Sequence, residues 1–153
     1  MKKEQAATDF NAFPQVVAIV GSRTFPHKHW VTSFVEKLQP DTVIVSGGAD
    51  GVDTWAEQAA LSRRMRTKIF EIESWEWDLY GKKAGRYRNE TLVAYLKQVG
   101  GHLVAFPLVD ENDMMSRGTK HVIEAASRHN ISITIYSAPA SEVKQAQDTI
   151  ARV

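Results

Sequence analysis

Glycine, arginine and small hydroxyl side chains follow two short apolar runs of this 153-residue chain. The run TVIVS leads into GGADGVD at residues 47–53, and VVAIV leads into Gly21, Ser22 and Arg23. Glycine lets an anion come close to backbone N–H groups, and arginine offers a forked cation to a phosphate or a carboxylate. These residue types predict an anion site where the two runs end.

A third candidate is the arginine at position 88. It lies four residues before Leu92 and eight before Leu96, so it extends an apolar helical stripe towards the start of its helix. Charged side chains rarely point towards a core unless they are paired. Arg88 is therefore a candidate anion ligand, with Asn89 beside it. Aromatic residues crowd the segment 75–87; packing is the simpler interpretation, and stacking on a base is the alternative.

The segment SRGT at residues 116–119 opens another helical pattern. The first N–H groups of a helix lack intrahelical partners and carry the positive end of its dipole. A further helix is expected to start near Gly51, with Asp50 as its cap and Asp53 in its first turn. We favour these structural roles over catalysis for both acids, although Asp50 can also accept a hydrogen bond from a ribose hydroxyl. The candidate ligand-binding residues are Gly21, Ser22, Arg23, Gly47, Gly48, Asp50, Gly51, Arg88, Asn89, Ser116, Gly118 and Thr119.

Five apolar runs are expected to form strands, with helical patterns between them. Such alternation predicts βαβ units with right-handed crossovers. The fold class is therefore α/β, a three-layer Rossmann-like sandwich with a five-stranded, mainly parallel sheet. In such sheets ligands bind beyond the carboxyl ends of the strands, where the candidate segments would meet. The expected strands are 16–20, 42–46, 68–72, 102–106 and 131–136.

Around this domain, assigned to residues 15–138, we expect a loose N-terminal lead-in at 1–14 and a C-terminal helix or tail at 139–153. The chain has no cysteine, which excludes disulfides, thiol catalysis and cysteine-bound metal. His27 and His29 lack a third ligand, so we expect no metal and no cofactor, and His121 is expected to point outward.

No apolar stretch approaches the ~20 residues of a membrane span, so no membrane partner is expected and a cytoplasmic location is the default. A net charge of +1 and a pI near 8.0 argue against a nucleic-acid partner.

Four motifs in order resemble one known family. VAIVGSR, VSGGADGVD, AGRYRNETL and SRGTKHVIEAA together resemble the YspA-type branch of the SLOG superfamily, which includes the Lonely Guy proteins and the DNA-processing protein A domain. The likeness covers residues 16–136. It implies a phosphate site formed by Gly118, Thr119 and the loop 47–51, with Arg88 beside it. Because related proteins are often dimers, it also implies a homodimer.

One position departs from the Lonely Guy pattern. Those enzymes are phosphoribohydrolases that cleave the N-glycosidic bond of cytokinin nucleotides, and their Gly-Thr-x-x-Glu motif would place its acid at the position of Val122. Glu124 lies about 140° around the helix from Thr119, so it is expected to face solvent. The remaining candidates for a catalytic carboxylate, among which the spacing does not choose, are Asp50, Asp53, Glu73 and Glu90.

Three functions remain open on these grounds. The intact phosphate loops and the valine favour a module that binds a nucleotide or nucleotide-derived ligand, such as one related to NAD or ADP-ribose, as a sensor or carrier. The alternative is a nucleoside 5′-monophosphate N-glycosidase that uses the same site. The third is a single-stranded DNA-binding protein, for which the resemblance and a basic cluster at residues 63–68 are the grounds.

Overall fold

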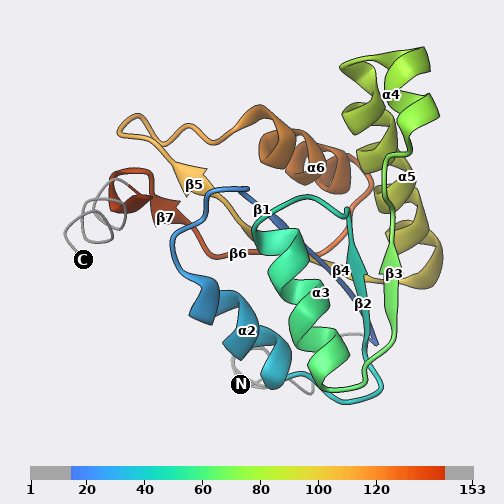
Figure 1. Cartoon of the computed structure of the whole chain (residues 1–153), viewed down its shortest axis with the longest axis vertical. Coiled ribbons are helices and arrows are strands. Elements are labelled where there is room, and N and C mark those ends of the chain that lie inside the picture. The colour runs from blue at the N-terminus through green and yellow to red at the C-terminus, as the bar shows by residue number, and fades with distance from the viewer. Residues whose placement is uncertain (1–14, 144–153) are drawn as a thin grey trace.

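A sheet of five parallel strands forms the frame of the molecule (Figure 1). The computed structural model describes residues 15–143. The order of the strands across the sheet is β3-β2-β1-β4-β6, and every pairing is parallel. The α/β fold expected from the sequence is therefore confirmed. The strands are β1 (Val16–Gly21), β2 (Val43–Ser46), β3 (Thr67–Ile69), β4 (His102–Phe106) and β6 (Ile133–Ile135).

Helices cover both faces of the sheet and complete the three layers. They are α2 (Lys28–Glu36) and α3 (Val52–Ser62) on one face, and α5 (Lys83–Val99) and α6 (Arg117–Arg128) on the other. Alternate side chains of β1 enter the two cores: Val17 and Ile19 pack on α2 and α3, whereas Ala18 and Val20 face α5 and α6. Burial on both faces explains why the run VVAIV carries no polar residue.

The strand order reverses between β1 and β4, at the centre of the sheet. From β1 the chain moves outward through β2 and β3, and it then crosses to β4 and β6 on the other side. The two central strands stay in register to their carboxyl ends, where Gly21 lies opposite Phe106. The N–H of Ser22 then donates to the Phe106 carbonyl at 3.2 Å. Ligands of open parallel sheets bind at such a reversal, so this point positions the site.

Three short elements were not predicted from the sequence. They are α4 (Ser74–Tyr80), β5 (Leu108–Val109) and β7 (Ala138–Pro139). A capping box between Glu73 and Glu76 fixes the start of α4, and no residue of this helix is buried. The lead-in 1–14 and residues 144–153 of the predicted tail lie outside the described residues. Within residues 15–143, every helix is too short or too polar to cross a bilayer.

Gly51 allows the loop after β1 to pack against the start of α3. Its φ angle is 78°, in the left-handed region. A Cβ at this position would lie 2.5 Å from the carbonyl oxygen of Arg23. The bare backbone here is therefore required by a neighbouring segment of the same chain.

We predict that Gly51→Ala lowers the free energy of unfolding by about 2 kcal/mol, because alanine meets both the left-handed φ and the Arg23 carbonyl. Gly85→Ala is the control, since Gly85 lies in α5 and a Cβ added there would meet no atom within 4 Å. Alanine favours a helix, so this control should gain up to ~1 kcal/mol. Denaturant unfolding measures both changes, and an unchanged stability of Gly51→Ala would contradict the packing.

Candidate functional site

A cleft of about 400 Å³ opens where the strand order reverses. Four segments meet there, namely the loops after β1 and β2 and the N-terminal parts of α5 and α6. Most of the predicted ligand residues line it, but Gly48, Asp50 and Gly51 do not. The lining residues are Val20, Gly21, Ser22, Arg23, Thr24, Gly47, Ala49, Asp53, Arg88, Asn89, Leu92, Ser116, Gly118, Thr119 and Val122.

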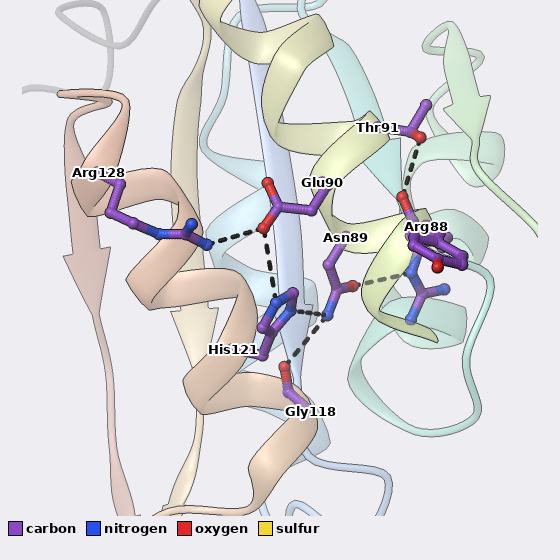
Figure 2. Close-up of polar contacts among 8 residues, drawn as sticks. Arg88, Asn89, Glu90, Thr91, Gly118, His121 and Arg128 are labelled. Carbon is purple, nitrogen blue, oxygen red and sulfur yellow. Dashed lines mark hydrogen bonds and ion pairs between the residues drawn. The ribbon is translucent and has the colours of Figure 1, made fainter. Parts of the chain in front are cut away.

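Arg88 connects α5 to the loop after β2. Its Nη1 donates to the carbonyl oxygen of Gly47. Its Nε donates to Asn89 Oδ1 at 2.9 Å (Figure 2). Burial lowers the pKa of Arg88, while the nearby Asp53 carboxylate opposes that shift. The Asp53 carboxylate thus favours the charged form of this guanidinium group. Within residues 15–143 its Nη2 has no partner, which leaves this nitrogen for a ligand.

Asp53 is the buried carboxylate of the cleft. The sequence favoured a structural role for it and kept it as one of four candidates for a catalytic carboxylate. Its side chain is 3% exposed, and its Oδ2 accepts from the N–H groups of Gly47 at 3.1 Å and Ala49 at 3.4 Å. A Cβ at Gly47 would lie 2.9 Å from this oxygen and 2.6 Å from Arg88 Nη1. Gly47 is thus bare because the chain's own Asp53 and Arg88 approach it.

This arrangement corrects the expected role of the loop 47–51. The N–H groups of Gly47 and Ala49 are occupied by Asp53, and that of Gly48 donates to Ser46 Oγ at 3.1 Å. These amides are therefore not free to cradle an anion. The cap of α3 is Gly51 rather than Asp50, and a glycine has no side chain to form a capping bond. The first-turn carboxylate of Asp53 accepts from the amides of Gly47 and Ala49 instead. The placement of Asp53 in the first turn is confirmed.

The first turn of α6 retains open donors. Ser116 occupies the cap position, but its hydroxyl accepts no capping hydrogen bond from a backbone N–H and donates to Thr119 Oγ1 at 3.3 Å. In the part of the chain that the structure describes, the N–H groups of Gly118 and Thr119 have no hydrogen-bond partner. Both residues line the cleft, so the positive end of the α6 dipole is directed at it.

Arg23 brings a second guanidinium group to the cleft. Its charge contributes to lowering the pKa of Arg88, which means that the two cations repel each other. Arg23 makes no ion pair or side-chain hydrogen bond with any of residues 15–143. Because Asp53 offsets only one of the two charges, an anion held between the guanidinium groups would relieve the repulsion.

Asn89 and His121 join α5 to α6, and Asn89 also lines the cleft (Figure 2). Asn89 Nδ2 donates to the Gly118 carbonyl at 3.4 Å and lies 3.2 Å from His121 Nδ1. His121 was expected to point outward, but its side chain is only 18% exposed, with Nε2 3.6 Å from Glu90. The missed signal was its position four residues before the buried Ala125, which places it at the edge of the helix stripe that faces α5.

The structure shows which of the candidate catalytic carboxylates lie in the cleft. Val122 is buried and lines the cleft, while Glu124 is exposed and pairs with Lys120 at 3.9 Å, as expected. Asp53 lines the cleft. The others, Asp50, Glu73 and Glu90, are absent from its lining.

Burial raises the pKa of Asp53 from its ordinary value of 3.8 to about 6, against the opposing effects of Arg88 and the two N–H donors. Below pH ~4 the Asp53 carboxyl is protonated in both the folded and the unfolded chain. Between pH ~4 and about 6 the unfolded chain loses this proton while the folded chain keeps it, so the free energy of unfolding falls as the pH rises. A shift of about two pKa units corresponds to about 3 kcal/mol.

We therefore predict that Asp53→Asn, which stays neutral, becomes progressively more stable than the unchanged chain as the pH rises from about 4 to about 7. Urea unfolding at a series of pH values gives the difference between the two chains. Glu57, whose pKa burial also raises, is present in both chains, so taking the difference removes the part of its contribution that does not arise from its interaction with Asp53. A difference in the free energy of unfolding that stays constant over this pH range would show that burial does not raise the pKa of Asp53.

Three comparisons relate the chain to known proteins. A model of the family described as DNA recombination-mediator protein A matches residues 7–70. The gene 61 protein of Mycobacterium phage D29 is 32% identical over 125 residues, covering 76% of this chain and 92% of that protein. The X-ray structure of DNA processing protein A from Streptococcus pneumoniae superposes with a TM-score of 0.57 at 19% identity, over 94% of this chain.

The chain spans 58% of the length of that solved structure, and this likeness shows the fold. The YspA-type branch suggested by the motifs is not confirmed by these matches. The phage protein is matched over nearly its whole length at an identity that indicates common descent. The chain therefore belongs to the family of the phage D29 gene 61 protein, and its fold is the Rossmann-like α/β fold found in DNA processing protein A.

Proposed function

We propose that the chain binds the phosphate of a nucleotide in the cleft. The observation that carries this proposal is the convergence of Arg23, Arg88 and the open first turn of α6 on one cavity. Guanidinium groups and free helix amides are the donors that match phosphate oxygens. Asp53 offsets only part of the positive charge, and the volume of about 400 Å³ is typical of small-ligand sites.

The nucleotide that we favour is a unit of a single strand of DNA. The cleft continues at Arg23, Arg88 and Gly118 into a second cavity of about 730 Å³, which we call the basic hollow. Its further cationic lining residues are Lys82, Lys83, Arg86, Arg117 and Lys120. The net charge of +1 is an average over the whole chain and does not exclude a basic face. The names of the matched family and solved structure, which both refer to DNA, support this choice.

The test uses Gly118, which lies in the open first turn of α6. We predict that Gly118→Asp weakens binding of a fluorescein-labelled 20-nucleotide oligothymidylate by at least about tenfold, because its carboxylate enters the phosphate position. An acid in a first helical turn favours the helix, and no atom lies within 4 Å of a Cβ here, so the fold should be retained. Gly118→Ala is the matched control and should bind within about twofold of the unchanged chain.

Fluorescence anisotropy measures these affinities, and the affinity of the unchanged chain should fall steeply with salt. Thermal shifts with thymidine 5′-monophosphate and ADP-ribose test the free-nucleotide interpretation. A shift with either, without binding of the oligonucleotide, would replace DNA by a small ligand. Absence of binding to all three probes would overturn the proposal.

A second candidate function is cleavage of a nucleotide N-glycosidic bond. Asp53 favours it, because a cleft carboxyl with a pKa of about 6 can hold a proton for a leaving base near neutral pH. We predict that any release of free base from nucleoside monophosphates is lost in Asp53→Asn, while binding of the same nucleotide persists. Chromatography detects the base, and its absence with the unchanged chain would exclude this candidate.

A further inference from the structure

The helix α4 carries an exposed aromatic surface. It lies at one end of the molecule beyond α5, away from the sheet (Figure 1). None of its residues is buried, and its large side chains Trp75, Trp77 and Leu79 are 55%, 45% and 66% exposed. Such a group of exposed apolar side chains on a small domain indicates a surface that contacts a partner.

Only one of these tryptophans faces the basic hollow. Trp77 lines it together with the cations of the α4–α5 turn and of α6, whereas Trp75 does not. The indole of Trp75 donates to Glu73 at 2.8 Å, and its ring lies 6.4 Å from that of Tyr80. Trp77 has no ring partner among residues 15–143, so its ring is available to a ligand.

The positive charge of the basic hollow indicates which kind of partner can bind there. Lys82, Lys83 and Arg86 stand on the α4–α5 side, and Arg117 and Lys120 stand on the α6 side. The one carboxylate among its lining residues, Glu124, is paired with Lys120. A second copy of this chain would present the same positive surface, which would be repelled. A strand of nucleic acid combines phosphates for the cations with flat bases for an exposed indole.

We propose that Trp77 is a stacking platform for a base of single-stranded DNA, and that the basic hollow binds the nucleotides next to the one held in the cleft. This inference rests on the proposed function. The cleft and the hollow share Arg23, Arg88, Asn89 and Gly118, so the two cavities adjoin and a strand held in one would extend towards the other. The lysines of the α4–α5 turn then contact the phosphates that follow, and Trp77 contacts a base between them.

The experiment compares two tryptophans on one helix. We expect Trp77→Ala to weaken oligothymidylate binding about tenfold, the effect typical of losing one stacked base. Trp77→Tyr, which keeps a flat ring, should restore most of the affinity. Trp75→Ala is the control, because Trp75 is on the same helix and similarly exposed but does not line the hollow. In addition, the oligonucleotide should quench a component of tryptophan fluorescence that Trp75→Phe retains and Trp77→Phe loses.

The readouts separate failure of this inference from failure of the proposed function. If the unchanged chain binds the oligonucleotide but Trp77→Ala and Trp75→Ala bind it equally well, the stacking platform is wrong and the cleft proposal stands. Equal weakening of both variants would likewise overturn a specific role for Trp77. If the unchanged chain binds none of the oligonucleotide, thymidine 5′-monophosphate and ADP-ribose, the proposed function itself fails; if it binds a free nucleotide but not the oligonucleotide, the stacking platform for DNA is wrong.

Discussion

The cleft depends on the approach of a buried carboxylate and a guanidinium group to one glycine. Asp53 accepts the amides of the loop after β2, and Arg88 donates to the carbonyl of Gly47 in the same loop. A carboxylate with 3% exposure is costly to bury without such donors and a nearby cation. These contacts fix the wall between β2 and α5, and Asn89 extends them to α6 through Gly118 and His121.

The same contacts decide where an external anion can bind. Asp53 is in effect an internal anion that occupies the amides of Gly47 and Ala49 in the loop after β2. The open donors then come from α6, together with Arg23 and the free nitrogen of Arg88. Two cations against one partly protonated acid leave the cleft positive, and the basic hollow beside it adds further positive charge. This distribution of charge and open donors is the basis on which we propose a phosphate site on the side of β1 and α6.

Much of this could be predicted from the sequence. Runs such as VVAIV are buried on both faces and can only be central strands, and the topology of a parallel sheet brings the loops after them together. The helical spacing of Arg88 from Leu92 and Leu96 placed a cation at the cleft. A glycine in the sequence, however, does not indicate whether an external anion or the chain's own side chains approach its backbone. Gly47 was therefore predicted to contact an anion, whereas Asp53 and Arg88 contact it.

Other features lay outside the reach of pattern analysis. The helix α4 has seven residues and no buried face, so it lacks the apolar periodicity by which helices are recognised. His121 lies at the margin of the buried stripe of α6. Residue spacing alone does not show whether a neighbouring helix offers a polar partner there, as α5 does with Asn89. The burial of Asp53 accompanies the folding back of its side chain onto the amides of Gly47 and Ala49, in a loop whose Gly48 and Gly51 have left-handed φ angles, and residue spacing does not predict this arrangement.

The central claim is that α6, rather than α3, supplies the backbone donors for phosphate. Backbone amide NMR during titration with thymidine 5′-monophosphate tests it most directly. We expect the largest displacement at the amides of Gly118 and Thr119, with those of Gly47 and Ala49 moving little because Asp53 already holds them. Large displacement at Gly47 and Gly48 with a stationary Gly118 would contradict the account.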